Sequence, residues 1–291
     1  MNRRQALLMA IFLLLISYVC PVAFGQEYVV EPDIRYGLVE GTELLLDLAR
    51  PAKGNGPFPA LVFIHGLMGH RTYYYPQIIL AAKRGYVAVT IDYLTPLVTG
   101  DGKFKNTFPA VIAGDKCAVR WLRANATKYN IDTNHLGAIG WSAGGHQALI
   151  LGFTDPSDGL EGNCGDLSYS SRVQAVVNIA GQANLTGAAG GEKTLIGGTF
   201  DQMPEKYRQA SPLTYVSNDD PPVLTLHGDK DTTVPVEQAL LLDQKMKEVG
   251  VPHILIITKG GGHYAPSSFF EEYYPLWDFL DKYLKPNTEH R

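Results

Sequence analysis

The 291-residue sequence lacks several features that would indicate particular classes of function. It has no excess of basic residues, because 25 lysines and arginines stand against 29 aspartates and glutamates, and the formal charge is −4. This balance excludes an extended basic face for nucleic acid. Its histidines are scattered without the spacing of metal ligands and no paired carboxylates offer a site for a hard ion, so no metal or other cofactor is expected. It also has no internal repeat and no low-complexity segment, which favours one large globular domain.

Long apolar runs are absent except near the N-terminus. Residues 1–25 are typical of a signal peptide, because Arg3 and Arg4 precede an apolar run that ends at Val19, and small residues follow at the cleavage position. That run is too short for a membrane span. Cys20 raises a lipoprotein alternative, although the residues before it form a poor lipobox. We therefore expect a secreted or periplasmic protein in which residues 26–291 form a single domain with no stable membrane span.

The most informative motif is Gly140-Trp141-Ser142-Ala143-Gly144. The apolar run before it predicts a strand and the small residues after it predict a helix, so the serine lies on a sharp turn between the two. Such a turn projects the hydroxyl away from the backbone, and the flanking glycines let the helix and strand approach closely. Ser142 is therefore the candidate nucleophile. On this motif alone, an ordinary strand-to-helix turn is an open alternative.

Two later segments offer the base and the acid that a serine nucleophile requires. Asp229 and Asp231 follow the apolar run 222–226, and His263 follows the next predicted strand, 253–258. Loops at the carboxyl ends of parallel strands carry the chemistry of open α/β sheets. The order Ser, Asp, His is that of α/β-hydrolases and differs from the orders of chymotrypsin and subtilisin.

Backbone donors for an oxyanion are predicted at two places. The Ala143 amide stands at a helix N-terminus directly after the nucleophile, and the Leu67 amide follows a buried strand and His65-Gly66, with Met68 as the second choice there. Met68, Tyr73 and Trp141 are candidate substrate-binding residues. For Tyr73, packing of a helix is an equal alternative, and for Trp141 the alternative is packing against the sheet.

Removal of residues 1–25 leaves Cys117 and Cys164 as the only cysteines. In an oxidising compartment we expect them to pair, which would tie a predicted helix at 110–126 to the loop at 159–171. On the chain-entropy model a loop of this length contributes about 4 kcal/mol. Two separate buried thiols are the alternative.

Strand and helix patterns alternate along the rest of the chain. An antiparallel hairpin is expected over 34–49, and 184–212 is expected to form a short lid. Parallel strands are expected near Leu61, Val87, Leu136, Ala175, Val223 and Ile254, and helices near 76–84, 109–126, 142–151, 235–249 and 269–284. This alternation predicts an α/β fold with a doubly wound, mostly parallel sheet and an antiparallel N-terminal edge.

Several segments, in this order, resemble the α/β-hydrolase superfamily and, within it, the esterases and lipases grouped with feruloyl esterase-like (BD-FAE-like) domains. They are Phe58–Gly66, Arg84–Tyr93, Phe108–Ala110, Ala118–Ala126, Gly140–His146, Ala210–Pro212 and His227–Pro235. The resemblance covers 28–284 and implies an α/β-hydrolase fold. It also implies that the acid is Asp231, three residues before Val-Pro, and that Asp229 is a turn former.

One departure concerns the oxyanion segment. Many relatives on this branch carry His-Gly-Gly-Gly, whereas this chain has His65-Gly66-Leu67-Met68. The two added side chains indicate a narrower or more apolar acyl side of the pocket.

These residues together predict a secreted serine carboxylesterase that acts on small or carbohydrate-linked esters. Ser142 would attack the carbonyl, His263 would take its proton, and Asp231 would orient the imidazole. A peptidase of the prolyl oligopeptidase type is the alternative enzyme, because the fold is shared. A noncatalytic binding protein on a hydrolase scaffold is the alternative from a different class. The fold fixes neither the acyl group nor the alcohol, and the oligomeric state is not determined by the sequence.

Overall fold

The computed structural model describes residues 27–186, 192–264 and 274–285. The predicted signal peptide lies outside these residues. Within them, no helix is both long and apolar enough to cross a membrane. The same residues contain no cluster of three or more His, Cys, Asp or Glu side chains that could hold a metal ion.

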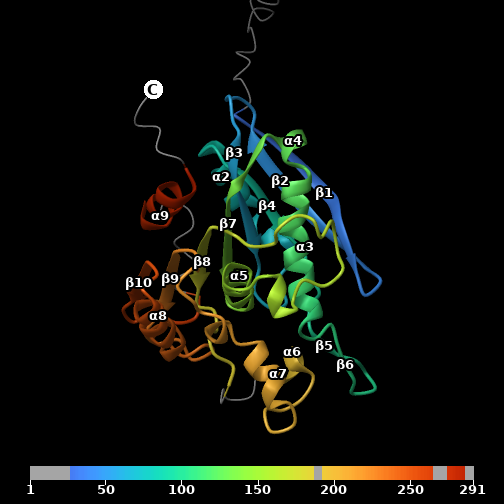
Figure 1. Ribbon diagram of the computed structural model, residues 1–291, viewed down its shortest axis with the longest axis vertical. Coiled ribbons are helices and arrows are strands. Elements are labelled where there is room, and N and C mark those ends of the chain that lie inside the picture. The colour runs from blue at the N-terminus through green and yellow to red at the C-terminus, as the bar shows by residue number, and fades with distance from the viewer. Residues whose placement is uncertain (1–26, 187–191, 265–273, 286–291) are drawn as a thin grey trace, which may run out of the picture.

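An eight-stranded sheet forms the centre of the molecule, with the strand order β1-β2-β4-β3-β7-β8-β9-β10 (Figure 1). The strands β4, β3, β7, β8, β9 and β10, in their order across the sheet, run parallel to one another. Strand β2 is antiparallel to both β1 and β4. This confirms the doubly wound sheet and its antiparallel edge hairpin. The strands are β1 (Tyr28–Val39), β2 (Thr42–Pro51), β3 (Phe58–Ile64), β4 (Val87–Ile91), β7 (Ile131–Trp141), β8 (Ala175–Ile179), β9 (Val223–Gly228) and β10 (His253–Thr258), with a separate ribbon of β5 (Leu97–Val98) and β6 (Phe104–Lys105).

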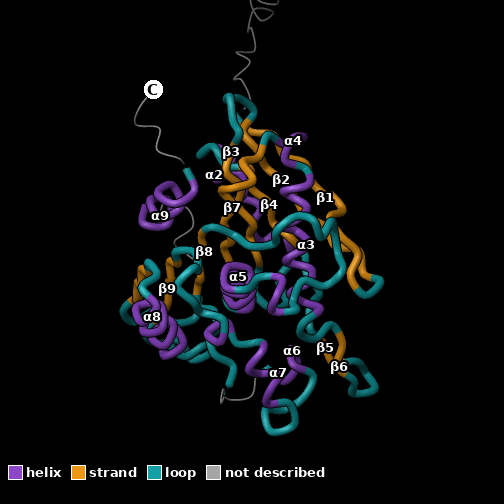
Figure 2. Tube along the Cα trace, in the orientation of Figure 1, coloured by secondary structure: helices purple, strands orange, loops and turns teal. Residues whose placement is uncertain are grey.

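Helices cover both faces of the sheet (Figure 2). The α-helices are α2 (Tyr75–Lys83), α3 (Ala110–Ala124), α4 (Ala126–Tyr129), α5 (Ala143–Phe153), α6 (Lys193–Ile196), α7 (Pro204–Gln209), α8 (Glu237–Val249) and α9 (Tyr274–Leu284). Short 3₁₀ turns are η2 (Arg71–Tyr74), η3 (Pro156–Asp158) and η4 (Pro212–Thr214). In the predicted lid segment, 184–212, the described helices are α6 and α7, and η4 begins at its last residue.

Two apolar cores lie on opposite faces of the sheet. Successive side chains of a strand point to opposite faces, so Val62 and Ile64 of β3 join the core beneath α3, α5 and α8, while Leu61 and Phe63 join the core beneath α2 and α9. Because both faces are buried, the central strands are almost continuously apolar. This is why their positions could be predicted from short apolar runs.

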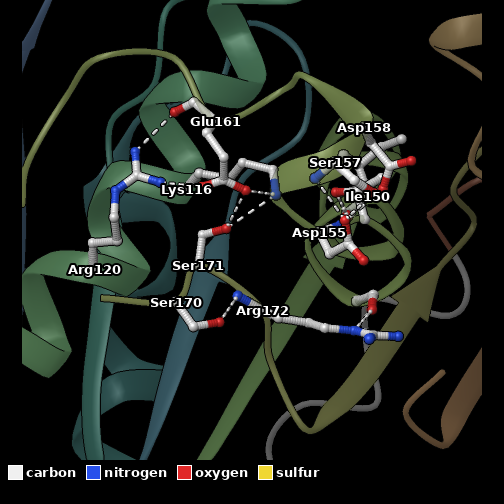
Figure 3. Close-up of polar contacts among 12 residues, drawn as sticks. Lys116, Arg120, Ile150, Asp155, Ser157, Asp158, Glu161, Ser170, Ser171 and Arg172 are labelled. Atoms are coloured by element: carbon white, nitrogen blue, oxygen red, sulfur yellow. Dashed lines mark hydrogen bonds and ion pairs between the residues drawn. The ribbon is translucent and has the colours of Figure 1, made fainter. Parts of the chain in front are cut away.

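Two connections hold the loop 159–171 against α3. Cys117 and Cys164 are joined in a disulfide, with Cα atoms 5.3 Å apart, as predicted from their being the only cysteines after residue 25. Beside it, Glu161 forms ion pairs with Lys116 at 2.8 Å and with Arg120, and both cationic side chains are fully buried. Ser171 Oγ donates a further hydrogen bond to Glu161 at 2.8 Å. Figure 3 shows these side chains converging on the Glu161 carboxylate.

Candidate active site

Ser142 lies on the turn between β7 and α5 with φ 56° and ψ −120°, a conformation that residues with a side chain rarely adopt. Its amide donates to the carbonyl of Ile179 on β8 at 2.8 Å. Glycine is required two residues before Ser142 and two residues after it. A Cβ atom at Gly140 would lie 2.0 Å from the carbonyl oxygen of Gly144, and one at Gly144 would lie 2.0 Å from that of Ile64. The motif therefore lets α5 begin directly against the ends of β7 and β3.

The structure brings together the three side chains predicted for the nucleophile, base and acid. His263 Nε2 lies 2.9 Å from Ser142 Oγ, and His263 Nδ1 lies 2.7 Å from Asp231 Oδ2. A carboxylate can only accept a hydrogen bond, so Nδ1 carries the proton and Nε2 is left to accept from the serine hydroxyl. This is the tautomer that a general base requires.

Asp231 is fixed by its own loop. Its Oδ1 accepts hydrogen bonds from the amides of Thr233 and Val234 at 2.8 and 2.9 Å, which leaves Oδ2 directed at His263. Asp229 has a different position, because its Oδ1 accepts from the Gly260 amide at 2.6 Å and so ties its loop to the segment before His263. This contact agrees with the structural role predicted for Asp229.

His227, at the end of β9, is a buried neighbour of the acid. Its Nε2 lies 2.8 Å from the carbonyl oxygen of Val234 and 3.4 Å from Asp231 Oδ2. Burial lowers the pKa of His227 below its usual value. A neutral ring that donates to Val234 braces the loop that carries Asp231.

A cavity of about 240 Å³ opens beside the nucleophile. Ser142, Ala143 and Leu67 all line it, so the two residues predicted to supply the oxyanion donors border the same space as the nucleophile. The Ala143 amide belongs to the first residue of α5, and the first amides of a helix have no acceptor within that helix. The other lining residues are Tyr93, Pro96, His146, Gln147, Gln182, Glu192, Thr194, Leu195, Thr233 and Val234.

The loop that carries Leu67 is anchored at both ends. The Gly69 amide donates to the Gly66 carbonyl at 3.0 Å, which closes a tight turn with Met68 at φ 62°. Just beyond it, the buried guanidinium of Arg71 donates to Asp47 on β2 at 3.0 Å, and it also pairs with Asp33 and Asp92. The Leu67 amide is thus held at a defined position relative to the sheet.

An aromatic rim lies on the side of the base. Trp141 packs against His263 with ring centroids 5.1 Å apart, and its Nε1 donates to the His263 carbonyl at 3.1 Å. Tyr73 stacks on Trp141 at 6.4 Å, and Tyr264 lies 5.0 Å from the same ring. Met68 is 88% exposed, and neither it nor Tyr73 nor Trp141 is among the described residues that line the cavity. A substrate-binding role for these three stays a prediction.

Several cavity residues carry no motif in the sequence. Tyr93 is the last residue of one segment of the family resemblance, and Gln147 lies on α5 just beyond another. Gln182 and Glu192 lie in the segment between β8 and β9. His146 also belongs to the wall of the cavity. It is buried, and its Nε2 donates to the Ala210 carbonyl at 2.7 Å.

The BD-FAE family model matches residues 46–246, more than half of the chain. The chain belongs to this family. The resemblance inferred from the sequence motifs is therefore confirmed, together with the α/β-hydrolase fold.

Individual relatives are similar over most of the chain. Esterase LipC of Mycobacterium tuberculosis is 30% identical over 264 residues, which is 84% of this chain and 62% of that protein. A truncated form of a carbohydrate esterase from gut microbiota has a TM-score of 0.75 and 27% identity, covering 89% of this chain and 97% of that one. Thermogutta terrifontis esterase 2 phosphonylated by cyclosarin has a TM-score of 0.68 and 26% identity, covering 86% and 90%. The chain spans only 53% to 62% of the length of the first three curated relatives.

Proposed function

We propose that the protein is a serine carboxylesterase that cleaves small or carbohydrate-linked esters through an acyl-enzyme on Ser142. The observation that carries the proposal is the hydrogen-bonded chain Ser142–His263–Asp231 at the edge of a cavity that the Leu67 and Ala143 residues also line. Similarity to an esterase and to a carbohydrate esterase supports an ester as the substrate.

In this mechanism His263 Nε2 takes the Ser142 proton as Oγ attacks the ester carbonyl. Asp231 stabilises the imidazolium, and the Ala143 and Leu67 amides hold the oxyanion of the tetrahedral intermediate. His263 then returns the proton to the leaving alcohol. A water molecule activated by the same histidine releases the acid and restores the serine.

The proposal includes export from the cytoplasm. Residues 1–25 would act as the leader, and the Cys117–Cys164 disulfide is the kind of bond that persists in an oxidising compartment. N-terminal sequencing of the protein released by its natural host checks this part, because it should start near residue 26. Recovery from the cytosol with Met1 intact would contradict it.

Covalent labelling tests the catalytic serine. A fluorophosphonate probe should label the wild-type protein at Ser142 and should fail to label Ser142→Ala, in line with the phosphonylated state of the esterase 2 neighbour. Ser142→Ala should also lower kcat on p-nitrophenyl acetate by roughly a million-fold. Labelling that persists in the variant would contradict the assignment of the nucleophile.

A panel of p-nitrophenyl esters, acetylated xylan, methyl ferulate and peptide p-nitroanilides distinguishes the classes of function. Turnover of esters alone supports the proposal. Efficient turnover of the anilides would favour the peptidase, and no turnover or labelling of folded protein would favour a binding role.

A further inference from the structure

His263 has to reach back across the sheet to meet Ser142. Ser142 follows β7, whereas His263 follows the edge strand β10, and β8 and β9 lie between these two strands (Figure 1). Neighbouring strands are about 4.8 Å apart, so the base has to cross about 14 Å. The crossing segment contains Gly260, Gly261 and Gly262, and glycine has the greatest backbone freedom of all residues. The place of the base beside the serine therefore depends on what anchors this segment.

The first part of the segment is tied to the loop after β9. The Gly260 amide donates to Asp229 Oδ1 at 2.6 Å, and the Gly261 carbonyl accepts from the Lys230 amide at 2.8 Å. These contacts bring the chain as far as the end of β9. The remaining step, from the end of β9 to the end of β7, is made at His263.

Trp141, the last residue of β7, holds the backbone of His263. Its Nε1 donates to the His263 carbonyl oxygen at 3.1 Å, and the centroids of the two rings are 5.1 Å apart. Trp141 directly precedes Ser142 in the chain. One side chain thus links the backbone of the base to the backbone of the nucleophile.

The same indole packs against the oxyanion turn. A Cβ atom at Gly66 would lie 2.7 Å from Cε3 of Trp141 and 2.8 Å from its Cζ3, so the benzene edge of the indole lies against the Gly66 backbone. Gly66 precedes Leu67, whose amide is a predicted oxyanion donor. Tyr73, on η2 just after this turn, stacks on the indole with an angle of 12° between the ring planes. Trp141 therefore contacts the segments that carry the base and one oxyanion donor.

These contacts bear on the rate of the reaction rather than on binding of the acyl group. Trp141 is not among the described residues that line the cavity beside Ser142. A general base acts only from hydrogen-bond distance, and a misplacement of about 1 Å can cost about a hundredfold in rate. A side chain that fixes the base and the oxyanion turn together can therefore change the rate without touching the substrate.

We infer that Trp141 is a positioning residue that holds the His263 backbone and the oxyanion turn at Gly66 in place beside Ser142. The inference rests on the proposed function, since it assumes that His263 acts as base and as acid on an ester. It assigns a mechanistic role to the residue before the nucleophile, for which substrate binding and packing against the sheet were the alternatives.

Two esters that share an acyl group and differ in the leaving group test the inference. Methyl butanoate releases methoxide, which needs a proton from His263, whereas p-nitrophenyl butanoate releases a stable anion that leaves without one. A displaced His263 should therefore slow acylation by the methyl ester more than acylation by the p-nitrophenyl ester. The quantity measured is the ratio of kcat/KM for the methyl ester to that for the p-nitrophenyl ester. It is a ratio within one protein, so a loss of folded material cancels.

Trp141→Phe keeps an aromatic ring and removes the Nε1 donor. The ratio should fall at least about fivefold, and kcat on methyl butanoate should fall about tenfold or more while KM changes less than about threefold. The matched control is Trp277→Phe, which shrinks a fully buried ring in the core beneath α2 and α9. The control should unfold at lower urea than the wild type, and its ratio should stay within about twofold of the wild-type ratio.

Benzothienylalanine at position 141 isolates the hydrogen bond. Its sulfur replaces the Nε1–H group while the shape of the ring system is kept, so the fold is retained even if Trp141→Phe does not fold. The ratio should again fall, by at least about threefold, because the His263 carbonyl loses its donor.

A ratio within about twofold of the wild-type ratio in the folded variants at position 141 would overturn the inference. So would a loss of kcat/KM confined to the p-nitrophenyl ester, which is the result expected of an indole that binds an aromatic alcohol. Wild-type protein that is labelled by the fluorophosphonate, together with an unchanged ratio in the variants, would refute the role of Trp141 alone. Absence of labelling and of turnover in the wild type would refute the proposed function.

Discussion

Ser142 is held in its unusual backbone conformation by contacts on both sides. Its amide is hydrogen-bonded to β8, and the glycines at 140 and 144 fix the approach of α5 to the sheet. A side chain at φ 56° and ψ −120° strains the backbone, typically by about 1–3 kcal/mol, and the surrounding fold must offset this cost. The gain is a hydroxyl that points at His263 rather than into the packed interior.

This strain predicts a difference between two inactive variants. Glycine reaches the Ser142 conformation without a Cβ clash, whereas alanine does not, so Ser142→Gly should be more stable than Ser142→Ala by about 1 kcal/mol. The greater freedom of glycine in the unfolded chain offsets part of the gain. Urea denaturation followed by tryptophan fluorescence measures the difference. A glycine variant that unfolds at lower urea than the alanine variant would show that the turn is not strained.

The two aspartates near β9 should differ sharply in their effect on catalysis. Asp231→Asn removes the carboxylate that holds His263 in the productive tautomer, so kcat should fall by roughly four orders of magnitude. Asp229→Asn keeps an oxygen that can accept from the Gly260 amide, and kcat should change by less than about tenfold. Steady-state kinetics on p-nitrophenyl acetate provides both values. The opposite ranking would make Asp229 the acid.

At the scale of helices and strands, the sequence pattern predicted the apolar, buried parts of the strands but not their polar or very short parts. The apolar run near Leu136 predicted β7, but the strand begins at Ile131 and includes the polar residues 132–135, because Ile131 pairs with Phe58 before a register shift. The ribbon of β5 and β6 has only two residues in each strand, which is too short for any periodicity. The predicted helix 109–126 divides at Asn125 into α3 and α4.

The loop 159–171 illustrates a tertiary contact that the sequence does not reveal. Its disulfide could be expected from the cysteine count, but the pairing of Glu161 with Lys116 and Arg120 has no local signature, because 41 to 45 residues separate the partners. Lys116 and Arg120 hold the pKa of Glu161 below its usual value even though burial acts to raise it.

Glu161→Gln should therefore destabilise the fold strongly. The variant leaves two buried cations without a counter-charge, and breaking a buried pair in this way costs about 3–5 kcal/mol. Glu205→Gln is the matched control, because it breaks an exposed pair with Arg208 and should change the free energy of unfolding by less than about 1 kcal/mol. Thermal and urea unfolding with the disulfide intact check both values. Equal stability of the two variants would mean that the disulfide alone holds the loop.

At the scale of the whole molecule, the parallel topology explains why the catalytic residues meet. Ser142, Asp231 and His263 follow β7, β9 and β10, whose carboxyl ends reach the same edge of the sheet. This convergence could be predicted from the alternation of strands and helices. The contribution of Gln182 and Glu192 to the cavity lining could not be predicted. They lie in the connection between β8 and β9, whose path depends on tertiary packing rather than on local periodicity.

The distribution of buried titratable groups determines how the whole molecule responds to acid. Burial lowers the pKa of four histidines, His65, His146, His227 and His253. Below about pH 6.5 the unfolded chain takes up protons at these residues that the folded protein does not, so each one removes stability as the pH falls. Burial also raises the pKa of Asp115, and that of Asp220 to about 6. These two act in the opposite sense, because the folded protein holds protons there that the unfolded chain releases.

Four destabilising groups against two stabilising ones predict a net loss of stability between pH 6 and pH 5. Each group changes the free energy of unfolding by at most about 1.4 kcal/mol per pH unit, so the excess of two gives at most about 3 kcal/mol over this interval. The loss should be shallower between pH 7 and pH 6, where the unfolded histidines are only partly protonated. Urea midpoints at pH 7, 6 and 5 measure the effect. A slope of the transition that is the same at each pH checks that unfolding stays two-state. Since the Ser142→Ala variant retains all six groups, it should show the same dependence as the wild type, which separates acid unfolding from the titration of the active site. A midpoint that rises from pH 6 to pH 5 would mean that the two buried carboxyl groups outweigh the histidines.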